Sequence, residues 1–161
     1  MDRFRRTGYT VSAIRAARTT DYPERTNHMT MKISFPGGKK VRADYRGFGI
    51  LTDQSVEQGG EGAAPSPFSL FLASLGTCSG FYVLAFCQKR GIDTGGIEIS
   101  LVPQSNEESK KLERVKLDIV FPNGFPERYM AACVNAASLC AVKRALQDPP
   151  EIEINTSIKE K

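Results

Sequence analysis

The feature that most constrains the fold is an uncharged run of twenty residues, 68–87. Ser66 followed by Pro67 predicts an N-cap and a first helical turn, because proline's fixed φ suits a position whose N–H would have no helical partner. Residues 88–91, Gln-Lys-Arg-Gly, predict the end of the helix. The apolar side chains between these signals lie all round the helix, so we expect a long central helix that is buried on every side.

The centre of this predicted helix is small and polar. Residues 76–80 read Gly-Thr-Cys-Ser-Gly and surround Cys78. The run is long enough for a membrane span. Its polar centre and the absence of a second such run in the sequence favour a soluble domain without a membrane partner. The other alternative is an inert core cysteine, because buried cysteine usually behaves as a small hydrophobe.

The charge of the chain is concentrated near its start. The net charge is +4, and residues 1–28 supply +3 of it, from six arginines against three acidic residues. We therefore interpret residues 1–28 as a basic, flexible arm and residues 29–161 as a single domain. The near-neutral domain, and the few aromatic residues in the arm, do not favour nucleic-acid binding.

Four cysteines and one histidine limit the chemistry. The cysteines form no Cys-x-x-Cys pair, and His28 alone is too little for a usual zinc site, so we expect no metal and no cofactor. The start of the sequence shows no apolar leader segment. Thiols in a domain of this kind favour the reducing cytoplasm.

Alternating apolar residues predict short strands on both sides of the central helix. The segments 31–35, 40–45 and 48–52, separated by Gly-containing turns, predict a three-stranded antiparallel meander. A glycine-rich loop fills 53–65, and segments 97–102 and 112–121 predict a hairpin. A second helix is predicted over 126–147 and a last strand over 151–155. The order βββ–α–ββ–α–β indicates an α+β domain with antiparallel sheets.

Two cysteines lie on different predicted helices among small residues, Cys78 and Cys140. They can form a disulfide if their Cα atoms come within about 7 Å. A peroxide reductase needs such a pair, because one thiolate becomes a sulfenic acid and a second thiol condenses with it. Cys87 faces the opposite side of the helix from Cys78 and is interpreted as core. Cys133 shares a face with Cys140 and stays open as an alternative resolving thiol.

Two segments resemble the OsmC/Ohr family, which comprises osmotically induced and organic hydroperoxide resistance proteins. They are residues 62–78, which end at Cys78, and residues 137–143 around Cys140. The resemblance implies an intertwined homodimer with the two central helices packed together and each active site at the subunit boundary. It implies that Cys78 is the peroxidatic thiol and Cys140 the resolving thiol. The substrate would be an organic hydroperoxide, and the reductant a small or protein dithiol.

The sequence departs from the family pattern at two points. Family peroxidases carry a glutamate after the proline that opens the central helix, where this chain has Phe68. They also carry an arginine in the first hairpin, for which Arg42, Arg46 and Lys39 are the candidates here, with Lys40 as a substitute. Lysine lacks the bidentate fork of arginine and stabilises a thiolate less well.

Aromatic side chains on the central helix suggest the substrate. Apolar walls from Phe71, Phe81 and Tyr82 would suit an alkyl or lipid hydroperoxide better than hydrogen peroxide. We therefore favour a cysteine-based hydroperoxide reductase. The alternative is a binding or thiol-carrier module on the same fold without peroxidase turnover, which the missing glutamate favours.

Overall fold

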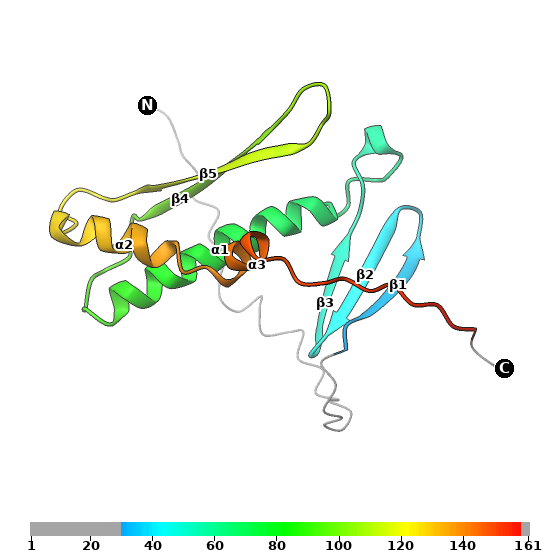
Figure 1. The fold of residues 1–161 in the computed structure, drawn as a ribbon, viewed down its shortest axis with the longest axis horizontal. Helices are drawn as coiled ribbons and strands as arrows, with labels where there is room; N and C mark the ends of the chain where they lie inside the picture. Colours follow the sequence, from blue (N-terminus) through cyan, green and yellow to red (C-terminus); the bar gives the residue numbers. More distant parts are fainter. Residues whose placement is uncertain (1–29, 159–161) are drawn as a thin grey trace, which may run out of the picture.

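The computed structural model describes residues 30–158, so the predicted arm at 1–28 lies outside the described residues. Figure 1 shows a long central helix with a hairpin along one side, two short helices beside it, and a separate three-stranded sheet at its N-terminal end. The arrangement is an α+β fold with antiparallel sheets, as the sequence predicts.

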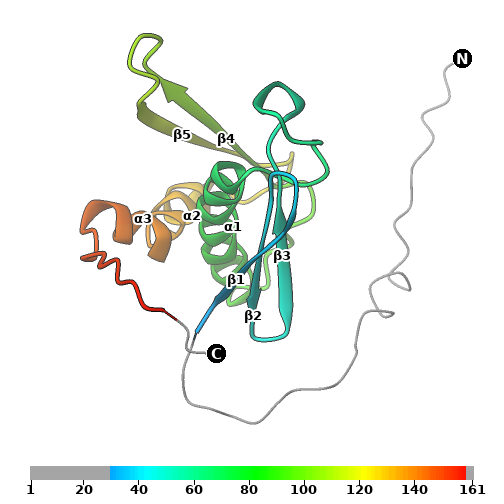
Figure 2. The same ribbon diagram turned by 90° about the vertical axis from the view of Figure 1, so that its right-hand side faces the viewer.

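The predicted meander is present. It consists of β1 (Lys32–Gly37), β2 (Lys40–Tyr45) and β3 (Phe48–Thr52). The β2–β3 turn places Arg46 and Gly47 at φ 49° and 81°, two positive angles of the kind that a tight two-residue hairpin requires. Ile33, Ala43 and Ile50 pair across the strands and share one apolar face. Figure 2 shows this sheet beside α1, but it makes no extensive contact with the helices or with the hairpin of the same chain.

The loop after β3 is held by one buried carboxylate. Asp53 is 1% exposed and accepts hydrogen bonds from the backbone N–H groups of Gln54, Glu61 and Ala63, at 2.8, 3.1 and 3.0 Å. The loop contains a 3-10 turn at Val56–Gln58, and an ion pair of 2.7 Å between Lys40 and Glu61 ties it to β2. These bonds order the glycine-rich connector that leads into the central helix.

Helix α1 (Pro67–Gln88) begins and ends where the sequence predicts. The Ser66 hydroxyl accepts a hydrogen bond from the Ser69 N–H at 3.1 Å and so caps the helix. The expectation of burial on every side is not met within one chain. The buried residues, Leu75, Ser79, Val83 and Cys87, recur at every fourth position and form a single stripe.

Two structures meet over that stripe: in Figure 2 the β4–β5 hairpin lies above α1, and α2 and α3 lie to its left. The hairpin of β4 (Glu98–Ser105) and β5 (Leu112–Val120) packs through β4, where Leu101 and Ile99 lie over Gly76 and Gly80. The neighbouring face of α1 packs against α2 (Met130–Ala137) and α3 (Ala141–Gln147). The two glycines that flank Cys78, Gly76 and Gly80, therefore lie against β4.

The second predicted helix is not continuous. A 3-10 turn at Glu127–Tyr129 precedes α2, and the chain leaves the helical conformation at Cys140, whose φ and ψ are −49° and 122°. The Ser138 hydroxyl donates to the Val134 carbonyl at 3.2 Å, and the Cys140 sulfur accepts from the Lys143 N–H at 3.4 Å. Such side-chain bonds to the backbone compete with the helical pattern and divide the helix.

The predicted strand at 151–155 is also wrong. These residues have no regular structure, and Ile152 and Ile154 are 81% and 89% exposed. An isolated segment gains no backbone hydrogen bonds without a neighbouring strand, and none of the described strands pairs with this one. The alternating sequence of the segment thus has no partner within the described chain.

We predict that Asp53→Asn lowers the melting temperature by several degrees, because the charged acceptor of three backbone N–H groups is lost. These hydrogen bonds lower the pKa of Asp53, the bond from Ala63 most of all, against the opposing effect of burial. A lowered folded-state pKa contributes stability above the unfolded value, and this contribution is lost as the pH falls below about 4. Melting curves from pH 7 to pH 3 should therefore converge for the two proteins at low pH; a constant difference would contradict this account.

Candidate active site

Cys78 and Cys140 come together where the middle of α1 meets the break between α2 and α3. Cys140 is fully buried and Cys78 is half-buried. The Cys140 sulfur lies 3.8 Å from the Leu75 carbonyl oxygen, one helical turn before Cys78. The side chains of Cys78 and Ser79 also interact with the Cys140 sulfur. The two cysteines that the sequence singles out thus share one small site.

The environment of Cys140 stabilises a thiolate. Burial alone would raise the pKa of this thiol. The backbone N–H groups of Lys143 and Val142, together with the side chains of Cys78 and Ser79, outweigh burial, so that the pKa lies below its usual value of 9.0. The backbone donors are available because the chain turns at residues 138–140 and α3 begins directly after Cys140.

The other two cysteines form a separate pair in the core. The sulfur atoms of Cys87 and Cys133 lie 4.0 Å apart, and neither residue is exposed. Burial and the neighbouring Cys87 raise the pKa of Cys133 to about 11. The same core cluster contains Val83, Phe125 and Ala137. Cys133 therefore faces Cys87 rather than Cys78, and its thiol stays protonated at neutral pH.

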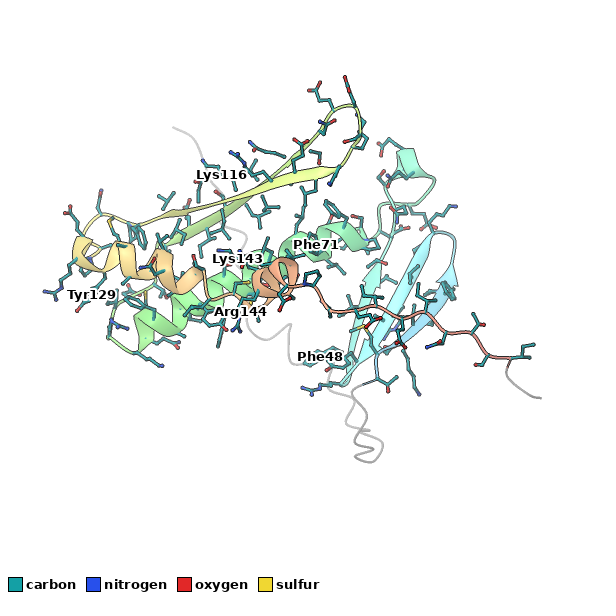
Figure 3. All side chains as sticks on the ribbon, viewed as in Figure 1. Phe48, Phe71, Lys116, Tyr129, Lys143 and Arg144 are labelled. Carbon is teal, nitrogen blue, oxygen red and sulfur yellow. The ribbon has the colours of Figure 1, made fainter. Side chains whose placement is uncertain are left out.

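A cavity of about 610 Å³ lies between β5 and the helices, against the residues that surround Cys140. Its walls are mainly apolar and include Leu75, Leu117, Ile119, Val134, Ala137 and Leu146. Its polar groups are Ser79, Asp118, Ser138 and Lys143. Figure 3 shows Lys143 on the side of α3 that faces the hairpin.

The aromatic residues proposed from the sequence as pocket walls do not line this cavity. Phe71 packs against Phe68 with ring centroids 5.6 Å apart, and Phe81 packs against Tyr82 at 5.7 Å. Phe68 and Phe81 are largely exposed, at 51% and 63%. The sequence offered little indication of the cavity that the structure contains, because its walls are built from alternate residues of β5 together with residues of two short helices.

The candidate cations lie on the β1–β3 sheet, away from Cys78 of the same chain. Arg42 forms an ion pair with Asp44 at 2.8 Å, and Arg46 lies over the Tyr45 ring at 5.2 Å. Lys39 lies in the β1–β2 turn, and Lys40 pairs with Glu61, which raises the lysine's pKa. Since this sheet makes no extensive contact with α1, one chain alone does not bring these side chains to the thiols.

Two further features limit the chemistry and the setting of the site. Among residues 30–158 no group of three or more His, Cys, Asp or Glu side chains is placed to hold a metal ion. Helix α1 is long and apolar enough to cross a membrane by length and composition, which is weak evidence because core helices of soluble proteins meet the same requirement.

The comparisons with known proteins identify the family. Residues 59–155, more than half of the chain, match the family model described as OsmC-like protein. The chain therefore belongs to the OsmC-like family. No curated protein matches the sequence.

Solved structures share the fold at low sequence identity. A protein from Psychrobacter arcticus superimposes with a TM-score of 0.64 at 22% identity, over 73% of this chain and 88% of that one. The OsmC-like protein of Mycoplasma pneumoniae gives 0.61 at 12% identity, over 76% and 89%. An organic hydroperoxide resistance protein from Elizabethkingia anophelis gives 0.52 at 18% identity, over 74% and 89%. At such identities the likeness establishes the fold.

We predict that native protein at pH 8 resists alkylation at Cys87 and Cys133, because both thiols are buried and the pKa of Cys133 is about 11. Cys78 should react first. Peptide mapping after a short treatment with iodoacetamide should locate the label, and a sample in denaturant, which labels all four cysteines, serves as the control. Rapid labelling of Cys133 in the native protein would contradict the paired, desolvated core thiols.

Proposed function

We propose that this protein is a thiol-dependent peroxidase that reduces organic hydroperoxides, with Cys78 as the attacking thiol and Cys140 as the resolving thiol. The observation that carries the proposal is the meeting of these two thiols, from separate helical segments, beside a cavity with apolar walls. Membership of the OsmC-like family, and the fold shared with an organic hydroperoxide resistance protein, support it.

The reaction proceeds in two steps. The Cys78 thiolate attacks the terminal oxygen of the hydroperoxide; the O–O bond breaks, Cys78 becomes a sulfenic acid, and the alkoxide takes a proton and leaves as the alcohol. The Cys140 sulfur then attacks the sulfenic sulfur, a disulfide forms, and the departing hydroxide is protonated to water. A small or protein dithiol returns the pair to the reduced state by thiol–disulfide exchange.

The cavity suits an apolar substrate. Its volume of about 610 Å³ falls within the range of small-molecule sites, and its walls are mostly aliphatic. An alkyl or lipid hydroperoxide would place its chain there, with the O–O group toward the thiols. Reduced thiols and a dithiol reductant fit a cytoplasmic setting.

The proposed peroxidase acts as a homodimer. One chain leaves apolar side chains exposed on the face of the β1–β3 sheet and on α1, and a second copy would cover both. The most exposed are Ile33, Phe35, Phe48, Phe68 and Phe81. In an intertwined dimer the sheet of one chain would lie against α1 of its partner. Arg42, Arg46, Lys39 or Lys40 of one chain would then reach Cys78 of the other and stabilise its thiolate.

A second candidate is a binding or thiol-carrier module without turnover. Phe68 favours it, because this exposed aromatic residue replaces the glutamate that family peroxidases carry at the start of the central helix. Dithiol-dependent consumption of cumene hydroperoxide by the purified protein separates the two candidates. A peroxidase consumes it repeatedly, whereas a carrier module does not.

We predict that one equivalent of cumene hydroperoxide joins Cys78 to Cys140 within one chain, as non-reducing peptide mapping would show. Cys78→Ser should abolish peroxide consumption. The matched control, Cys87→Ala, lies on the same helix outside the site and should keep it. A bridge from Cys78 to Cys133 would reassign the resolving thiol, and an unmodified Cys78 would leave the carrier module as the function.

We predict that Phe81→Glu weakens the dimer on the order of 1,000-fold, because each buried phenylalanine contributes about 2 kcal/mol and two are lost per dimer. Sedimentation at micromolar concentration measures the change. Gln88→Glu, which adds the same charge at an exposed position near the end of the same helix, is the control and should remain dimeric. A monomeric wild-type protein would contradict the proposed assembly.

A further inference from the structure

A second cavity lies beyond the end of α1, apart from the thiols. Its volume is about 510 Å³, within the range of small-molecule sites. Two connecting segments form it, residues 90–95 between α1 and β4 and residues 122–129 between β5 and α2. It shares no lining residue with the cavity beside Cys140. The proposed peroxidase site therefore does not include it.

One side of this second cavity is apolar and is fixed by packing. Three of its lining residues, Ile92, Phe125 and Tyr129, belong to the core cluster or pack against it. Phe125 is 7% exposed, and the Tyr129 ring meets the Phe86 ring at a steep angle with centroids 6.1 Å apart. The organic part of a ligand would thus meet an ordered apolar surface.

Two arginines that line the cavity lie near the same aromatic ring. The guanidinium carbon of Arg90 lies 6.0 Å from the centre of the Tyr129 ring, and that of Arg128 lies 4.9 Å from it. Arg90 also lies over the Phe86 ring at 3.8 Å and donates a hydrogen bond to the Phe86 carbonyl oxygen at 3.3 Å. Figure 3 shows Tyr129 at the end of the molecule where α2 begins. Cation–π contacts restrain both guanidinium groups, so less side-chain freedom is lost when a ligand binds.

Neither arginine has an acidic partner among residues 30–158. None of the ion pairs in that range includes Arg90 or Arg128. The acid among the lining residues is Asp93, whose carboxylate accepts a hydrogen bond from the Gly95 N–H of its own loop at 3.0 Å. Each guanidinium carries five N–H donors, and most of them remain available to an oxyanion. An anion between the two groups would also offset the repulsion of their like charges.

We propose that this cavity binds a small phosphate monoester, with the phosphate between Arg90 and Arg128 and the organic group against the apolar side. A phosphate monoester carries close to two negative charges above its second pKa of about 6, whereas a carboxylate carries one. The planar fork of arginine matches phosphate oxygens in a bidentate arrangement. The site goes beyond the proposed peroxidase function and does not require it.

A ligand at this position would join two segments that are distant in the sequence. Arg90 follows the end of α1, and Arg128 lies in the 3-10 turn before α2. The two guanidinium groups come together only in the folded chain, so the ligand binds the folded state and not the unfolded one. Binding should therefore raise the melting temperature of the protein.

Calorimetric titration of the intact protein with phenyl phosphate at pH 8 tests the site. We expect saturable binding at one site per chain. Inorganic phosphate lacks the organic group, and phenylacetate has the ring but a single negative charge, so each should bind at least tenfold more weakly at matched ionic strength. Absence of phenyl phosphate binding at millimolar concentration overturns the proposal. So does an affinity no greater than that for either of the other compounds.

Two charge-removing variants locate the ligand. Arg90→Gln and Arg128→Gln should each weaken phenyl phosphate binding by tenfold or more, because each removes one fork. Lys89→Gln removes the same charge at an exposed neighbouring position that does not line the cavity, and this control should keep the wild-type affinity. Equal affinity in all three variants overturns the proposal.

Two further measurements keep the result decisive. Melting curves check the folding of each variant; if the loss of the contact with Phe86 unfolds Arg90→Gln, Arg128→Gln decides the question. Cys78→Ser should bind phenyl phosphate as the wild type does, whether or not the protein consumes hydroperoxide. Loss of binding in Cys78→Ser would locate the ligand at the thiols and overturn the proposal.

Discussion

The structure depends on the need to cover a 22-residue helix that has no charged side chain from Phe68 to Cys87. One chain covers a single stripe of it, where the β4–β5 hairpin and the helices α2 and α3 meet over neighbouring faces of α1. The β1–β3 sheet of the same chain carries an apolar face and leaves the rest of the helix uncovered. In the proposed homodimer a second copy would bury both surfaces and remove them from water.

Two pairs of free thiols lie in contrasting environments, one between α1 and α2 and the other between α1 and the start of α3. Cys87 and Cys133 meet where α1 and α2 pack closely, and burial raises the pKa of Cys133 to about 11. Cys140 is equally buried, yet its pKa is lowered, because the chain turns before α3 and directs backbone N–H groups at the sulfur. The break in the second helix therefore separates a buried thiol with a lowered pKa, Cys140, from one with a raised pKa, Cys133.

The sequence predicted the elements that local signals define, and missed those that distant contacts decide. Ser66 and Pro67 located the start of α1, and the glycines of the hairpin turns located β1–β3. The prediction of one continuous helix over 126–147 was wrong. The side chains of Ser138 and Cys140 bond to the backbone where the helix is interrupted, and the apolar periodicity of the sequence gives no signal of these bonds. The prediction of a strand at 151–155 was also wrong, because no strand among the described residues pairs with this segment.

The same distinction holds at the site. Small residues around Cys78 and Cys140 indicated that the two thiols could meet, whereas the contributions of Ser79 and of the Lys143 N–H depend on how the helices pack. The only feature of the sequence that could have indicated a role for Ser79 is its position directly after Cys78 in the middle of the predicted helix. The apolar cavity was missed because β5 and two short helices form it together.

The most direct test of the account is native mass spectrometry of the intact protein before and after one equivalent of cumene hydroperoxide per chain. The account predicts a dimer in which each chain loses the mass of two hydrogens, as a disulfide within the chain requires. A monomer, or a chain that gains oxygen or keeps its mass, would contradict it.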